Sequence, residues 1–113
     1  MLQPSRGQVW RANLSPTTGH ETRGTRPCLI ITVDRFNHGP ADLVVVLPFT
    51  TKEKGIPFHI LESPPEGGLS ERSFIKCEEL RCISKQRLVE YMGDVSASSI
   101  EEASDYVRIL LGL

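Results

Sequence analysis

The chain has 113 residues, a length that fits one domain spanning residues 1–113. Hydrophobic residues make up 39% of it and no apolar run is long enough to cross a bilayer, so the composition excludes a membrane-spanning protein and predicts a soluble, globular one. The formal net charge of −1 argues weakly against a nucleic-acid-binding protein.

Seven short segments have the alternating or β-branched pattern that predicts strands. In chain order they are residues 7–13, 27–33, 42–49, 57–61, 73–78, 80–83 and 88–92. We expect Val9 to face inward, the second segment to be a buried strand that begins at Pro27, and the third to be central in its sheet. The fourth segment begins with Pro57, which suits the edge of a sheet.

Polar and turn-forming residues fill the intervals between these segments. The expected loops cover residues 14–19, 19–26, 50–55 and 62–70. Residues 34–37 fit a single helical turn capped by Asp34.

The hydrophobic period changes near the C-terminus. Apolar residues recur there at helical spacing: Ile100, Ala103, Val107, Leu110 and Leu111. Ser98 with Glu101 fits a capping box, and Ser96 is an alternative cap. The pattern predicts one amphipathic helix of about four turns. Short strands, frequent turns and a terminal helix together predict a mostly β fold, a small and strongly bent antiparallel barrel with a helix attached.

Cysteine usage favours a cytoplasmic protein. Cys28, Cys77 and Cys82 each fall inside a predicted strand, and their odd number favours reduced thiols. Residues 1–6 lack the apolar core of a secretion signal. The three histidines are scattered, so we predict no metal site, and no cofactor motif is present.

Charge is distributed unevenly along the chain. Residues 1–89 hold 12 of the 13 bases and 9 of the 14 acids, a net charge of +3, whereas the remainder is acidic. A local positive field matters more for binding a polyanion than the overall sum. The distribution is therefore a mild indication of a nucleic-acid partner.

Four local groups of polar side chains are candidates for chemistry. They are His20 and Glu21 with Arg26, Thr50 with Thr51, Lys76 with Glu78 on one predicted strand face, and Arg81. Cutting RNA without a metal requires a base for the 2′-hydroxyl, an acid for the leaving 5′-oxygen and a donor to the phosphorane. Glu21 or Glu78 fits the base, and Arg26, Lys76 and Thr50 fit the other roles.

Each candidate also has a purely structural interpretation. Glu21 fits a pair with Arg23 on a mobile loop, and Thr50 fits a turn whose backbone it satisfies. Lys76 and Glu78 fit a surface ion pair that contributes little to stability.

Several longer stretches together carry a family resemblance. They are residues 6–10, 14–21, 24–27, 37, 46–51, 54–58 and 81–83, and they include Gly-His-Glu, Arg-Pro and Pro-x-Thr-Thr at residues 19–21, 26–27 and 48–51. In these stretches the chain resembles the MazF/PemK (Kid-like) toxins of bacterial type II toxin–antitoxin systems. The likeness extends from residue 6 to the final helix.

The resemblance implies a fold and an activity. The fold is an SH3-like antiparallel β-barrel with a C-terminal helix, of the MazF/Kid/CcdB type, working as a homodimer. The activity is cleavage of single-stranded RNA (mRNA) at short sequences without a metal, which stops translation and growth until a cognate antitoxin blocks the site. Arg26 and Thr50 match the most widely shared catalytic pair, Glu21 an acid beside them, and His20 the histidine of the Kid-like branch. Lys76 and Glu78 stand where that branch has an arginine and an aspartate.

We therefore predict a sequence-specific endoribonuclease that needs no cofactor. The catalytic candidates are Arg26, Thr50, Glu21, Glu78 and Lys76, and the substrate-binding candidates are His20, Thr51, Arg23 and Arg81. The prediction requires Arg26 and Thr50 to converge on one phosphate-sized hollow. Two alternatives remain open: a non-catalytic toxin of the same fold that poisons DNA gyrase, and an RNA-binding module that stacks bases on Trp10 and Phe36.

Overall fold

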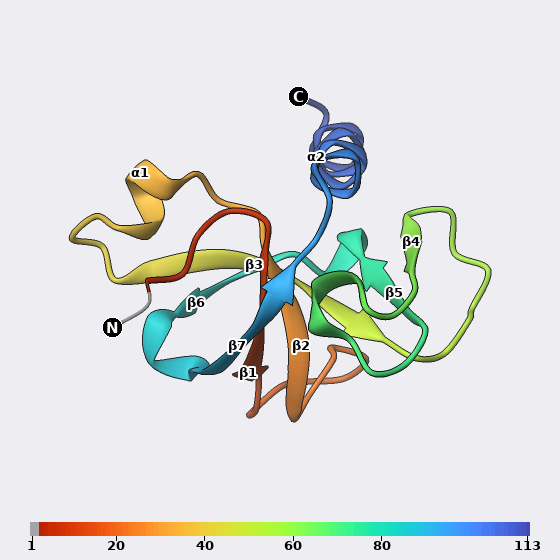
Figure 1. Ribbon diagram of the computed structural model, residues 1–113, viewed down its shortest axis with the longest axis horizontal. Helices are drawn as coiled ribbons and strands as arrows, with labels where there is room; N and C mark the ends of the chain where they lie inside the picture. The colour runs from red at the N-terminus through yellow and green to blue at the C-terminus, as the bar shows by residue number, and fades with distance from the viewer. Residues whose placement is uncertain (1–2) are drawn as a thin grey trace.

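The computed structural model describes residues 3–113 (Figure 1). The prediction that residues 1–6 contain no secretion signal falls partly on Met1 and Leu2, which lie outside the described residues. The strands are β1 (Gln8–Asn13), β2 (Thr25–Ile30), β3 (Leu43–Thr50), β4 (His59–Glu62), β5 (Ser73–Lys76), β6 (Arg81–Ser84) and β7 (Leu88–Asp94). The α-helices are α1 (Asp34–Asn37) and α2 (Ala97–Leu111), and the 3-10 helices are η1 (Glu66–Gly68), η2 (Cys77–Glu79) and η3 (Lys85–Arg87).

The strands form an antiparallel sheet in which β3 is the central member. The order is β4-β5-β3-β2-β1-β7, and β6 pairs with β3 beside that path. β3 pairs with three strands along its length: β6 at its start, β2 in its middle, and β5 at Phe49 and Thr50. The predicted mostly β, antiparallel fold with a C-terminal helix is confirmed. Within the described residues β4 and β7 do not pair, so the sheet bends without closing.

Two apolar clusters lie on opposite faces of the central strands, because successive strand residues point to opposite faces. Val9, Leu29, Leu47 and Phe49 belong to the larger cluster, which α2 joins through Ala103. The second cluster consists of Trp10, Ala12, Leu14, Cys28, Ile30, Val44, Val46 and Ile83. The inward orientation predicted for Val9 is therefore confirmed, since its side chain is fully buried.

Helix α2 lies against the larger cluster, on the upper side of the sheet in Figure 1. Ser96 rather than Ser98 is the N-cap, and its hydroxyl accepts the N–H of Ser99 at 3.2 Å. Leu111, which the sequence pattern placed on the apolar stripe, is 53% exposed. The stripe that packs on the sheet therefore ends one residue earlier, at Leu110.

Two details predicted for the first half of the chain are wrong. β2 begins at Thr25 rather than at Pro27. The pairing of β2 with β3 starts only at Cys28, so at Pro27 the strand β2 pairs with β1 and not with β3. A missing backbone N–H is tolerated at such a position. Asp34 does not cap α1, because its carboxylate instead accepts the N–H of Arg6 at 2.7 Å.

The segment over residues 62–70, predicted to be a surface loop, is partly a core element. Leu69 is 5% exposed and joins the larger cluster, and Gly67 is buried in η1. A methyl group added at Gly67 would lie 2.8 Å from the side chain of Val9. This segment therefore packs tightly on the sheet that carries the site described below.

The cysteines occupy different environments. Cys77 lies in η2 rather than in a strand, Cys28 is buried in β2, and Cys82 is exposed in β6. Burial raises the pKa of the Cys28 and Cys77 thiols to about 12, so neither is a thiolate at neutral pH. Among residues 3–113, no helix combines the length and the hydropathy needed to span a bilayer.

Candidate active site

Arg26 and Thr50 lie just beyond the paired part of two neighbouring strands, β2 and β3, and line the same hollow. The antiparallel register of β2 and β3 pairs Cys28 with Pro48. Arg26 is two residues before Cys28 and Thr50 is two residues after Pro48, so the two-residue period of a strand directs both side chains to one face. The sheet therefore brings together two residues that are 24 positions apart in the sequence.

A hollow of about 390 Å³, here called the central hollow, opens over these two residues. Its lining consists of Gly19, His20, Glu21, Thr22, Arg23, Arg26, Phe49, Thr50, Thr51, Lys52, Lys54 and Lys76. Basic side chains dominate the charged part of this set, so the hollow is suited to an anion. The predicted convergence of Arg26 and Thr50 is present in the structure.

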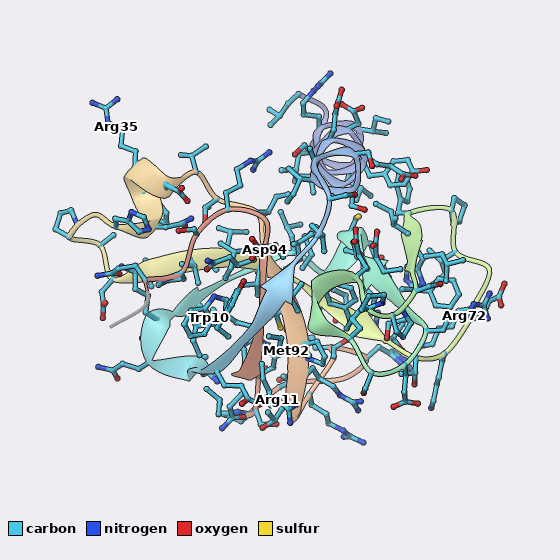
Figure 2. All side chains as sticks on the ribbon, in the orientation of Figure 1. Trp10, Arg11, Arg35, Arg72, Met92 and Asp94 are labelled. Atoms are coloured by element: carbon cyan, nitrogen blue, oxygen red, sulfur yellow. The ribbon has the colours of Figure 1, made fainter. Side chains whose placement is uncertain are left out.

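Two further hollows adjoin the central one. The η2 hollow, of about 470 Å³, is lined by His20, Glu21, Lys54, Ile56, Lys76, Glu78 and Glu79. The β7 hollow, of about 210 Å³, is lined by Arg11, Thr25, Arg26, Pro27, Phe49, Thr50, Thr51, Leu69, Ser70, Glu71, Ser73 and Met92. Because each shares lining residues with the central hollow, the three hollows are neighbours, and together they are called the groove here. Arg11 and Met92 mark its β7 end, which lies below the centre of the molecule and far from α2 in the view of Figure 2.

The hydrogen bonds of Arg26 and Thr50 leave both able to bind a phosphate. Arg26 donates through Nε to the carbonyl oxygen of Arg23 at 3.1 Å, which orients its guanidinium. The hydroxyl oxygen of Thr50 accepts the N–H of Lys52 at 3.2 Å. A hydroxyl that accepts in this way still has its own proton to donate.

Glu21 is held by its own loop. Its Oε1 accepts the N–H of Thr18 at 2.7 Å, and the side chain is exposed. Within residues 3–113, the ion pairs do not include one between Glu21 and Arg23, so that structural alternative is not observed.

Lys76 is buried, with 6% of its surface exposed, and forms an ion pair with Glu79. Its Nζ also donates to Oγ1 of Thr22 at 2.8 Å. Glu79 accepts the N–H of Thr22 at 2.7 Å, so the pair fastens the β1–β2 loop to η2. Burial raises the pKa of Glu79, but the hydrogen bonds from Lys76 and Thr22 outweigh it and the pKa is lowered.

Glu78 does not share a strand face with Lys76, and that prediction is wrong. β5 ends at Lys76 and the chain turns into η2, because it must leave β4 and reach the other half of β3 as β6. Glu78 nevertheless lines the η2 hollow beside Lys76. Its Oε2 lies 2.8 Å from Nε2 of His59.

The substrate-binding candidates divide into two groups. His20, Arg23 and Thr51 line the central hollow. Arg81 lines none of the three hollows, and its guanidinium donates to the carbonyl oxygen of Leu14 at 3.1 Å. Arg81 therefore supports the start of the β1–β2 loop.

Sequence reasoning missed Thr22, His59 and Glu79. Thr22 and Glu79 are 57 positions apart and meet only through tertiary packing. His59 meets Glu78 because β4 and β5 pair in the register that sets His59 against Lys76. Only a prediction that residues 57–61 and 73–78 pair as a hairpin in this register could have found the pair.

Trp10 is packed in the second cluster, with 9% of its surface exposed, and its indole N–H donates to Gln8 at 2.9 Å. This packing leaves little of the ring exposed for a base to stack on. The described residues also contain no group of three or more His, Cys, Asp or Glu side chains placed to hold a metal ion.

Comparison with known proteins gives consistent matches over nearly the whole chain. The model of a family described as PemK-like, MazF-like toxin of type II toxin-antitoxin system matches residues 5–111. Endoribonuclease MazF9 of Mycobacterium tuberculosis is 30% identical over 113 residues, covering 96% of each protein. Endoribonuclease MazF of Staphylococcus saprophyticus is 33% identical over 109 residues, covering 96% of this chain and 91% of the relative.

Solved structures agree with the sequence matches. MazF from Deinococcus radiodurans superposes with a TM-score of 0.89 at 24% identity, covering 100% of both chains. An endoribonuclease from a mycobacterial species, solved in complex with its cognate antitoxin, gives a TM-score of 0.78 at 25% identity, covering 100% of this chain and 97% of that one.

Proposed function

The chain belongs to the PemK-like, MazF-like toxin family of type II toxin–antitoxin systems, and we propose that it is an endoribonuclease that cuts single-stranded RNA at specific sequences without a metal ion. Two relatives that are named endoribonucleases are 30% and 33% identical to this chain, and the matches cover most of both chains. The endoribonuclease activity follows from these matches. Sequence specificity and metal independence are our additions, and they rest on the site.

One observation carries the proposal: Arg26 and Thr50 lie on one face of neighbouring strands and line one cationic hollow. A phosphodiester seated there would accept hydrogen bonds from the guanidinium and the hydroxyl. Those donors would strengthen as charge develops on the phosphorane, which is the interaction that accelerates transesterification.

The reaction that fits the site uses the 2′-hydroxyl of the RNA as nucleophile. A carboxylate, Glu21 or Glu78, takes the 2′-hydroxyl proton, the 2′-oxygen bonds to phosphorus and the bond from phosphorus to the 5′-oxygen breaks. The 5′-oxygen takes a proton from Arg26, leaving a 2′,3′-cyclic phosphate and a 5′-hydroxyl. We assign this proton to Arg26 rather than to Lys76 because Lys76 is already paired with Glu79.

The groove explains why the substrate would be single-stranded. Bases must be unstacked before their edges can be read, and only a single strand offers them. His20, Arg23 and Thr51 line the central hollow next to the scissile position and are our candidates for contacts to the flanking nucleotides.

We propose the remaining properties from family membership. The protein would act in the cytoplasm as a homodimer, cleave mRNA and so inhibit translation and growth. A cognate antitoxin would neutralise it, as the antitoxin complex of the mycobacterial relative suggests.

The test is to incubate the purified protein with a long mixed-sequence transcript in EDTA and to map the new ends. We expect cuts at one short sequence, with 5′-hydroxyl ends that polynucleotide kinase labels directly. Intact RNA together with inhibited gyrase supercoiling would overturn the proposal in favour of a gyrase poison. RNA that is bound but not cut would overturn it in favour of a binding module.

A further inference from the structure

A buried histidine stands behind one of the two candidate bases. His59 is the first residue of β4, and only 3% of its side chain is exposed. Its Nε2 lies 2.8 Å from Oε2 of Glu78, whose own side chain is 27% exposed and lines the η2 hollow. A carboxylate can only accept, so Nε2 carries the proton and donates it.

Each member of this pair has one buried atom without a hydrogen-bond partner, which is uncommon in folded proteins. Among the described residues, the buried side-chain atoms without a hydrogen-bond partner are Nδ1 of His59 and Oε1 of Glu78. A buried acceptor left unpaired costs free energy and therefore requires an explanation, such as a catalytic role. With Oε2 held by His59, Oε1 is the oxygen of Glu78 left to accept a proton.

Glu78 is also the better anchored of the two candidate bases. It lies in η2, directly after β5, whose Ile75 pairs with Phe49 on one side and Ile60 on the other. Glu21 lies on an exposed loop and is held by a neighbouring N–H of the same loop. Catalytic groups perform best on rigid elements with a supporting residue behind them.

Three of the other titratable groups around the η2 hollow do not replace Glu78. They are Lys54, Lys76 and Glu79. Glu79 is occupied by Lys76 and Thr22, and the two lysines are cations that cannot accept a proton.

We propose that His59 is a positioning residue that makes Glu78, rather than Glu21, the general base. The inference rests on the ribonuclease activity proposed above. His59 fixes Oε2, which leaves Oε1 as the accepting oxygen of a side chain that lines the η2 hollow. Oε1 then takes the proton of the 2′-hydroxyl as the 2′-oxygen bonds to phosphorus, and the departing 5′-oxygen takes a proton from Arg26.

The experiment compares two amide replacements, His59→Gln and His59→Asn. Glutamine places an N–H donor close to the position of Nε2, whereas asparagine is one methylene shorter and does not reach Glu78. We measure kcat and KM on an RNA oligonucleotide with one mapped cleavage site, in EDTA. Wild type and Arg26→Ala in the same assay report on the proposed activity itself.

We expect His59→Asn to lower kcat by about 10–100-fold with KM unchanged, the range seen when a residue that orients a metal ligand is removed. His59→Gln should restore most of that loss. Adding His59→Asn to Glu78→Gln should cost nothing more, because the histidine acts through the carboxylate.

Three results would overturn the inference while wild-type cleavage stands: wild-type kcat in His59→Asn, a loss that persists in the Glu78→Gln background, or no rescue by His59→Gln. If His59→Asn does not fold, as judged by circular dichroism, the kcat values of Glu78→Gln and Glu21→Gln are compared instead to identify the general base. A larger loss of kcat at Glu21 than at Glu78 would then exclude His59 as the support of the base. An inactive wild type would instead reject the proposed activity.

Discussion

Glu62, at the end of β4, is an almost enclosed carboxyl group with 6% of its surface exposed. The hydroxyl of Ser99 donates to its Oε1 at 2.5 Å and links β4 to the first turn of α2. Burial raises the pKa of Glu62, the hydrogen bond from Ser99 opposes that shift, and the nearby carboxylates of Glu66 and Glu102 add to it. The folded protein therefore holds this proton more tightly than the unfolded chain does.

That linkage predicts how Glu62→Gln changes stability. A raised folded-state pKa stabilises the protein at pH values below the ordinary value of 4.5, and this contribution is lost as pH rises through the raised value. Glutamine keeps an acceptor for Ser99 without the charge. We expect the free energy of unfolding of Glu62→Gln, relative to wild type, to be higher at pH 7 than at pH 4.5, as measured by urea denaturation. An identical difference at both pH values would contradict this.

The pKa of Glu79 is shifted in the opposite direction to that of Glu62, and Glu79 holds a loop. Its lowered pKa gives stability that is present above the ordinary value of 4.5 and lost as pH falls through the lowered value. Because Glu79 holds Thr22, acid should release the β1–β2 loop from η2.

We expect Glu79→Ala to abolish the hydrogen-exchange protection of the Thr22 amide at neutral pH, since that N–H donates to Glu79. Glu90→Ala is the matched control, because it removes the acid from an exposed ion pair with Arg11 that holds no loop. Protection at Thr22 that survives Glu79→Ala would show that the loop is held by other contacts.

At the scale of elements, η1 packs against β7 so closely that only glycine fits. Gly68 has a φ of +70°, and a methyl group on it would lie 2.0 Å from the carbonyl oxygen of Met92. Gly55 has a similar φ of +65°, but nothing lies within 4 Å of the position its methyl group would take. The two glycines therefore share a backbone strain and differ in the space around them.

We expect Gly68→Ala to lower the free energy of unfolding by about 1–3 kcal/mol more than Gly55→Ala, which is the usual cost of overpacking. Urea denaturation of both variants checks this. Equal losses would mean that the left-handed backbone, and not the contact with β7, is what requires glycine at Gly68.

Sequence reasoning found the elements that depend on local patterns. Strand periodicity placed Arg26 at the start of one strand and Thr50 directly after another, because a two-residue period is read directly from the chain. That the two residues converge on one hollow was a separate hypothesis, which the period does not fix. Sequence reasoning failed at η2, where the alternation continues into Glu78 although the backbone leaves the sheet at Lys76.

Sequence reasoning also failed where segments that are distant in the chain meet in the fold. The glycines of η1 read as a surface loop, because no local pattern shows that β7 lies against them. The pair formed by His59 and Glu78 depends on the register of β4 and β5, which sequence periodicity alone does not fix.

At the scale of the whole molecule, basic charge concentrates where the substrate would lie. The central hollow is lined by Arg23, Arg26, Lys52, Lys54 and Lys76, although the protein as a whole carries a net charge of −1. The acidic segment after residue 89 includes α2, which lies on the other side of the sheet (Figure 1). A molecule built in this way binds a polyanion locally without binding anions over its entire surface.

This distribution predicts a salt-dependent affinity. For single strands the slope of log K against log salt is about −0.7 for each phosphate neutralised, so Lys54→Ala should make the slope shallower by about 0.7. The ligand is an oligonucleotide with a 2′-deoxy substitution at the mapped cleavage site, titrated at several NaCl concentrations. Arg35→Ala, which changes a side chain that projects away from the sheet on α1, is the control (Figure 2). A slope unchanged by Lys54→Ala, or reduced equally by Arg35→Ala, would place the RNA elsewhere.

The most direct measurement is the single-turnover cleavage rate of the mapped oligonucleotide by Arg26→Ala and Thr50→Val, with Arg35→Ala alongside, in EDTA. Our account predicts losses of about 100-fold or more for the first two variants, because each removes a donor to the phosphorane, and a wild-type rate for the third. If Arg26→Ala and Thr50→Val cut as fast as wild type, the central hollow is not where the RNA is cleaved.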